Sequence, residues 1–311
     1  MRKIQSLHEL EAVAAQVVII NCGTKWVTSL ALLSALRHTT CPVLVIDCES
    51  ADHSEAHFKA LAEAQGLKFD WLSWPLRPHP VALDELFSGI PAASVLLMDS
   101  DLEILKPDLW HHARSALNSD PRHYGAGFVH GPCWIESDHG LPPYTGYYAE
   151  RMWIPFVLLR TEVIRRALRN GSSFMNRRPY LEIPGSPRLS RFLSYRFRLK
   201  GLRHLPPPRI SGTSSSAEAI DGHHPKFIEY DTGADLHASL LGDGYGFAGL
   251  PTSLWGDVSH HHGVTRARLA NFARLTARRL KLASGKTETP EIDVLTLVKE
   301  RLRTQYAVPI D

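Results

Sequence analysis

Apolar residues in the first hundred positions form short continuous runs, separated by segments with helical spacing. The runs do not alternate with polar residues, which is typical of strands covered on both faces. They are VVIIN at 17–21, VLVID at 43–47, the segment 69–74 and VLLM at 95–98. Between them, apolar positions recur at helical spacing in 28–37, 54–65 and 83–89, and Gly66 is placed to end the second helix. This alternation predicts an α/β fold with a mostly parallel sheet flanked by helices.

Beyond residue 125 the pattern is more mixed. A strand is expected at 156–160, a helix at 162–169 and a second helix at 235–241 that ends at Gly242. Segment 171–226 is rich in Pro, Ser, Gly and Arg, which predicts an irregular insertion that could form a lid. The tail from 265 onward has a helical pattern that Pro290 interrupts.

Composition limits the classes of function. A hydrophobic fraction of 44% and a charged fraction of 22% are those of an ordinary globular protein. The formal charge of +3 is too small for a general nucleic-acid binder, so no nucleic-acid partner is expected. The sequence contains no signal-peptide pattern, no run near the roughly 20 apolar residues of a membrane helix, and four cysteines without CxxC spacing. A cytoplasmic protein with reduced thiols is expected.

Two acidic residues follow the strand at 95–98. Asp99 and Asp101 are separated by Ser100 and leave a hydrophobic run where the carboxyl ends of parallel strands form a ligand-binding edge. Hard carboxylate oxygens suit Mg²⁺ or Mn²⁺, which proteins bind through one or two carboxylates together with substrate phosphates. Asp47 ends another of the predicted strands and is expected at the same edge.

These segments, in this order, resemble the inverting GT-A glycosyltransferases, especially family 2. The matching pieces are VVIINCG at 17–23, VLVIDCES at 43–50, VLLMDSDLEI at 95–104, FVLLRTEVI at 156–164, EYDTGADLHASLLGDGYGF at 229–247 and VSHHHG at 258–263. The resemblance implies a GT-A, Rossmann-like domain over 1–264, with a nucleotide-binding half near 15–125, an acceptor half near 126–264, the lid at 171–226 and a separate helical tail at 265–311. It also implies transfer of a sugar from a UDP-, GDP- or dTDP-sugar to an acceptor hydroxyl, with Mn²⁺ or Mg²⁺ as cofactor.

The resemblance assigns roles to residues of this chain. Asn21, Asp47, Asp99 and Ser100 would bind the donor, and Asp99 and Asp101 would hold the metal. Asp231 would be the general base that takes the proton of the acceptor hydroxyl. Because Tyr230 interrupts the Glu-Asp pair of the family, Asp235 or Glu229 is an alternative base, and Asp231 could equally cap the following helix.

Two further groups follow from the same resemblance. His260 and His262 would face the donor diphosphate or the metal, since alternate residues of a strand share a face. An exposed histidine loop is the alternative. Trp134, Tyr147 and Trp153 would line an acceptor pocket, because aromatic faces stack on sugars. Packing in the core is the alternative for these aromatic residues.

The acceptor class stays open among glycans, lipid-linked sugars and small molecules. The basic helix expected at 267–283 could contact the inner face of a membrane or dock on the protein itself. A sugar nucleotidyltransferase is a second reading, although NCGTKW at 21–26 offers only one glycine for a phosphate loop. A non-catalytic protein that binds nucleotide-sugars is the third.

Overall fold

The computed structural model describes residues 1–130, 151–174, 177–179, 209–211, 227–229, 232–261 and 294–309. The chain divides into two compact units. Unit 1 consists of residues 1–76, 91–112 and 251–311, and unit 2 consists of residues 77–90 and 113–250.

Unit 1 is built on a five-stranded parallel sheet. Its strand order is β1-β4-β3-β2-β5, and every pairing within it is parallel. The strands are β1 (Arg2–Ile4), β2 (Gln16–Asn21), β3 (Val43–Cys48), β4 (Asp70–Trp74) and β5 (Ser94–Asp99). Val17, Ile19, Leu44 and Val95 are all fully or almost fully buried, as continuous β-branched and aliphatic runs predict for strands covered on both faces.

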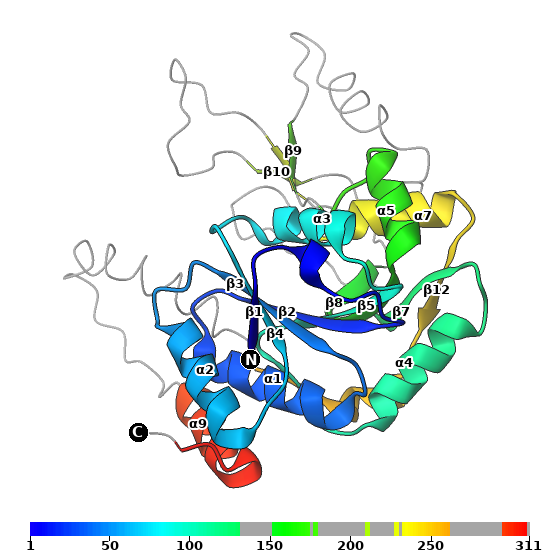
Figure 1. The fold of residues 1–311 in the computed structure, drawn as a ribbon. Coiled ribbons are helices and arrows are strands. Elements are labelled where there is room, and N and C mark those ends of the chain that lie inside the picture. The colour runs from blue at the N-terminus through cyan, green and yellow to red at the C-terminus, as the bar shows by residue number, and fades with distance from the viewer. Residues whose placement is uncertain are drawn as a thin grey trace, which may run out of the picture. The chain divides into compact units, whose positions relative to one another are not determined.

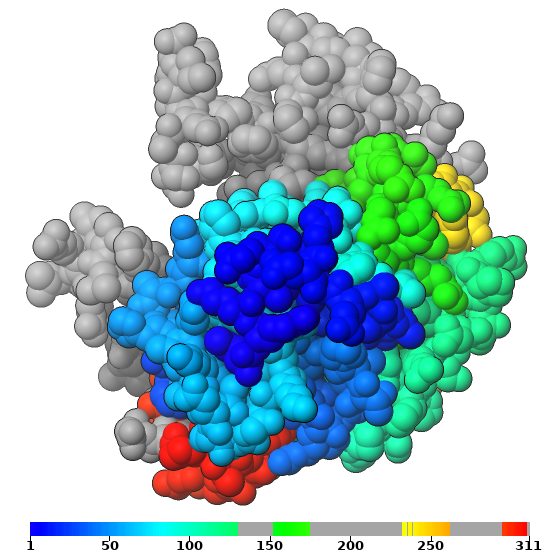
Figure 2. Space-filling view, viewed as in Figure 1, coloured from blue at the N-terminus to red at the C-terminus, as the bar shows by residue number. Residues whose placement is uncertain are grey.

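Helices and short segments complete unit 1. They are η1 (Leu7–Glu9), α1 (Lys25–His38), α2 (Ser54–Gln65), η2 (Thr252–Asp257), α9 (Val294–Tyr306) and the two-stranded ladder of β6 (Leu102–Ile104) and β13 (Val258–His260). Helix α1 packs between α2 and α9 and against β2 and β3 (Figure 1). In the space-filling view of Figure 2, α9 is drawn in red at the surface of this unit, below the dark blue N-terminal residues.

The order of the strands places a topological switch point at one edge of the sheet. The chain runs from β2 through β3 to β4 on one side, and β5 then pairs on the other side of β2. The carboxyl ends of β2 and β5 therefore form a topological switch point, where open α/β sheets bind their ligands. The register aligns Asn21 with Asp47 and Ile20 with Asp99, so polar residues from three strands share this edge.

Unit 2 contains the strands β8, β7 and β12, hydrogen-bonded in that order, with β7 antiparallel to β8 and parallel to β12. Helices α5 and α7 pack on β8, and α3 packs against α5. The elements are α3 (His79–Gly89), β7 (His123–His130), β8 (Arg151–Arg160), α5 (Thr161–Arg169), α7 (Ala234–Gly242), β12 (Gly246–Gly249) and the antiparallel sheet of β9 (Arg177–Pro179), β10 (Arg209–Ser211) and β11 (Phe227–Glu229). Helix α4 (Asp108–Asn118) spans the boundary between the units.

The predicted α/β class with a mostly parallel sheet is confirmed. The predicted strands and helices of residues 17–98 are present, but α1 begins at Lys25 and α3 at His79, both earlier than expected. The helix expected at 235–241 is α7, and α9 confirms helical structure in the part of the tail that the structure describes. The lid expected at 171–226 and the basic helix at 267–283 lie largely or wholly outside the described residues, and the division into domains stays a prediction. No helix in the described ranges is both long and apolar enough for a membrane span.

Candidate metal centre

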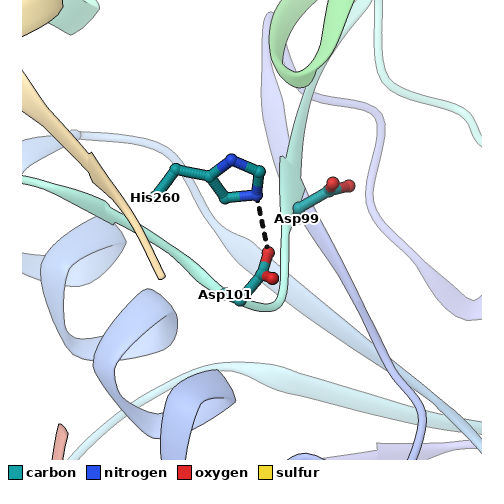
Figure 3. A group of neighbouring side chains, drawn as sticks. All are labelled: Asp99, Asp101 and His260. Atoms are coloured by element: carbon teal, nitrogen blue, oxygen red, sulfur yellow. Dashed lines mark hydrogen bonds and ion pairs between the residues drawn. The ribbon is translucent and has the colours of Figure 1, made fainter. Parts of the chain in front are cut away.

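Three side chains of unit 1 could together hold a metal ion. One ligand atom from each of Asp99, Asp101 and His260 lies within 4.8 Å of the other two. Asp99 ends β5, Asp101 lies in the turn before β6, and His260 ends β13. Asp101 is buried, whereas Asp99 and His260 are partly exposed. Figure 3 shows His260 and Asp101 facing each other, while Asp99 at the end of β5 directs its carboxylate away from them.

A short β-ladder explains why His260 lies here. β13 pairs antiparallel with β6, with His260 opposite Leu102 and Val258 opposite Ile104. Backbone hydrogen bonds extend the ladder at both ends, from His261 N to the Asp101 carbonyl at 2.8 Å and from Leu105 N to the Asp257 carbonyl at 2.8 Å. His260 Nε2 lies 3.0 Å from Asp101 Oδ1. The imidazole and carboxylate are therefore held together by backbone pairing rather than by a flexible loop.

The donor set fits a divalent cation. Two carboxylates supply the hard oxygen ligands that Mg²⁺ and Mn²⁺ prefer, and an imidazole nitrogen is better suited to Mn²⁺ than to Mg²⁺. Three protein ligands on one side of an ion would leave further coordination positions for substrate oxygens.

A buried polar network lies beside these ligands and joins three residues that were predicted to bind the donor. Asn21 Nδ2 donates to Asp47 Oδ1 at 2.6 Å, and Asn21 Oδ1 accepts from the Thr24 hydroxyl at 3.1 Å. The Thr24 hydroxyl oxygen also lies 3.3 Å from Ser100 Oγ, within hydrogen-bonding distance. The network thus runs from the end of β3 through β2 to the residue between Asp99 and Asp101.

The same network holds the loop after β3 in an unfavourable conformation. Glu49 and His53 have positive φ angles of 47° and 60°, which non-glycine residues rarely adopt. Asp47 accepts hydrogen bonds from the backbone and the hydroxyl of Ser50, and Lys25 Nζ donates to the carbonyl of Asp52 at 2.9 Å. Such strain persists only where surrounding contacts compensate for it, and it is concentrated at functional sites.

Sequence reasoning missed Glu103, a carboxylate on β6 that is only 1% exposed. Burial alone would raise the pKa of Glu103, but the contacts of His261, Arg301 and Tyr306 with its carboxylate and the charge of Arg301 outweigh burial, so the pKa lies below its ordinary value. Glu103 therefore carries a negative charge two residues from Asp101. Its position within the hydrophobic segment LEI was a signal in the sequence, because an acidic residue in a buried strand needs a partner.

The other predicted site residues have separate outcomes. Asp231, His262, Trp134 and Tyr147 lie outside the described residues, as do the side chains of the alternative bases Asp235 and Glu229. Trp153 lies on β8 in unit 2, where its ring is 6% exposed and contacts Phe128 edge to face. Its role toward an acceptor, like the base, stays a prediction.

This chain is similar to solved structures of other proteins at low sequence identity. No protein-family model matches the chain, and no curated protein matches it. Among solved structures, the mannosyltransferase PcManGT from Pyrobaculum calidifontis, in complex with GDP-Man and Mn²⁺, is 13% identical with a TM-score of 0.44, covering 94% of this chain and 71% of that protein.

Two other solved structures cover about half of this chain. The 4-diphosphocytidyl-2C-methyl-D-erythritol synthase from Anaerococcus prevotii is 11% identical with a TM-score of 0.39, covering 51% of this chain and 77% of that one. Residues 1–349 of TarS from S. aureus are 14% identical with a TM-score of 0.36, covering 50% of this chain and 49% of that one.

Proposed function

We propose that this protein is a metal-dependent glycosyltransferase that uses a nucleoside diphosphate sugar. The observation that carries the proposal is the convergence of Asp99, Asp101 and His260 at the switch point of a parallel sheet. The ordered motifs that resemble inverting GT-A enzymes supply the reaction class.

The residues of the site have distinct parts in this reaction. Asp99, Asp101 and His260 would hold Mn²⁺ or Mg²⁺, and such an ion offsets the charge that develops on a diphosphate leaving group. Asn21, Asp47 and Ser100 form the adjoining polar edge that would position the donor. Asp231 would accept the proton of an acceptor hydroxyl that attacks the anomeric carbon opposite the leaving nucleoside diphosphate, and such a single displacement would invert that carbon.

Metal-dependent nucleotide binding tests the proposal directly. Calorimetry with UDP, GDP and dTDP should detect binding that requires Mn²⁺ or Mg²⁺. A nucleotide that binds together with its metal ion should also raise the melting temperature by mass action. Slow release of the nucleoside diphosphate from a matching nucleotide-sugar should follow. Asp101→Asn should weaken the metal-dependent binding at least about tenfold, whereas Glu63→Gln, on the exposed face of α2, should not.

Two results would contradict the proposal. One is the absence of binding and of donor cleavage with every nucleotide and either ion. The other is release of pyrophosphate from a sugar 1-phosphate and a nucleoside triphosphate, because that product would identify a nucleotidyltransferase.

A further inference from the structure

The carboxylate of Glu103 connects the candidate metal centre to the C-terminal helix. Its Oε2 lies 2.6 Å from Arg301 Nε, and its Oε1 accepts a hydrogen bond from the Tyr306 hydroxyl at 3.0 Å. Both partners belong to α9, about 200 residues further along the chain. A charge that is 1% exposed is strongly destabilising without such partners, so α9 supplies the compensation that allows an acid at this position of β6.

Glu103 also contacts the strand that carries the histidine ligand. It lies opposite Ser259 in the β6–β13 ladder, and its Oε2 is 3.6 Å from His261 Nε2. The backbone N–H of His261 donates to the carbonyl of Asp101. One carboxylate thus lies between α9 and the two chain segments that bear Asp101 and His260.

Helix α9 is held in place by contacts other than Glu103. Val298 and Leu302 are fully buried, the Arg37 guanidinium lies 4.2 Å from the ring centroid of Tyr306, and Gln65 Nε2 donates to the Tyr306 carbonyl. Because these contacts anchor the helix independently, loss of the Arg301 charge need not release it. The effect of this ion pair on the metal centre can therefore be separated from its effect on folding.

We propose that Glu103 is a positioning residue for the metal centre and that Arg301 and Tyr306 of α9 hold it in place, so that the C-terminal helix is part of the site. This inference rests on the proposed function, since it requires that Asp99, Asp101 and His260 bind a cation. Groups that orient metal ligands typically contribute 10-fold to 100-fold to metal affinity.

The decisive measurement is the affinity of the full-length protein for Mn²⁺ alone, by electron paramagnetic resonance of the free ion at a temperature where every variant is folded. Arg301→Met keeps most of the length of the side chain and removes its charge. It should raise the Kd for Mn²⁺ about tenfold. The matched control is Arg303→Met on the same helix, where the arginine is 66% exposed and pairs with Glu300, and its Kd should equal that of the unmodified protein.

A second variant keeps the test valid if Arg301→Met does not fold. Glu103→Gln retains the shape of the side chain and leaves Arg301, whose side chain is 31% exposed, able to interact with water. It should weaken Mn²⁺ binding to a similar extent, and Arg301→Lys should restore part of the affinity because it retains the charge.

The outcomes separate the two proposals. If folded Arg301→Met or Glu103→Gln binds Mn²⁺ within about twofold of the unmodified protein, Glu103 has only a structural role, and the positioning proposal is wrong while the proposed function stands. If the unmodified protein does not bind Mn²⁺ or Mg²⁺, the metal centre and the positioning proposal both fail.

Discussion

His260 Nε2 lies 3.0 Å from Asp101 Oδ1, although 159 residues separate the two in the chain. The contact is a consequence of the β6–β13 ladder, which brings a strand from the far end of unit 1 beside the turn after β5. A metal ion held here would thus link two distant parts of the chain.

The first prediction concerns this histidine. His260→Ala removes the nitrogen ligand and should raise the Kd for Mn²⁺ about tenfold. Isothermal titration with Mn²⁺ measures the change. His111→Ala, an exposed position on α4, is the matched control and should have no effect. Unchanged affinity in His260→Ala would exclude the imidazole as a ligand.

The second prediction concerns Asn21, which is fully buried at the end of β2. Its amide nitrogen donates to Asp47, and its carbonyl oxygen accepts from Thr28 at 2.8 Å. Asn21→Ala should lower the free energy of unfolding by about 2 to 3 kcal/mol, because it leaves a buried carboxylate short of a donor. Urea denaturation at neutral pH tests this. Asn118→Ala at the exposed end of α4 should change the free energy by less than about 0.5 kcal/mol, and equal losses in the two variants would contradict the importance of the network.

The third prediction is a pH dependence of stability that arises from His237 of α7. Burial lowers the pKa of His237 from 6.5 to about 4, and its ring contacts the hydroxyl of Tyr124. Between these two values the unfolded chain binds a proton that the folded chain does not bind. The free energy of unfolding should therefore fall by up to about 3 kcal/mol as the pH drops from 6.5 to 4.

Urea denaturation at several pH values measures this contribution as a difference between variants. His237→Gln should show a shallower decline than the unmodified protein over that window, whatever constant offset the substitution adds. The exposed variant His112→Gln on α4 should keep the full slope. Parallel curves for His237→Gln and the unmodified protein would show that His237 is not the group responsible.

The fourth prediction concerns the close approach of β7 and β8. A Cβ atom on Gly127 would lie 2.9 Å from the backbone oxygen of Phe156 and 3.2 Å from the Cα atom of Val157. Backbone atoms in a sheet cannot move aside easily, so Gly127→Ala should cost about 1 to 3 kcal/mol of stability. At Gly256 a Cβ atom would meet nothing within 4 Å, and Gly256→Ala is the control. Thermal melts of both variants decide the matter, and equal melting temperatures would show that the sheet can relax.

The sequence indicated the central elements because their signals are local. Continuous apolar runs such as VLVID and VLLM predict buried strands. The segments with helical spacing between them predict helices that connect parallel strands as crossovers. Asp99 at the end of β5 and Asp101 just beyond it could be recognised for the same reason, since both directly follow the apolar run VLLM.

Strand β7 shows where local signals fail. Gly125 and Gly127 weaken any strand prediction, because glycine has low strand propensity. Glycine is nevertheless required at both positions, because Leu159, Phe247 and the backbone of β8 leave no room for a larger side chain. Packing against distant residues therefore decides the identity of these positions.

For this protein the sequence by itself predicted the α/β class, the order of the strands along the chain and the strand-end acids Asp47, Asp99 and Asp101, since each is signalled by a pattern within a few neighbouring residues. The family resemblance had named His260 and His262 as candidates, and the tertiary structure brings His260 to Asp99 and Asp101. Only the tertiary structure decided that Glu103 is bound by Arg301 of α9. These contacts join segments about 150 to 200 residues apart in the chain. Whether a buried charge is compensated becomes clear only when the position of its partner is known.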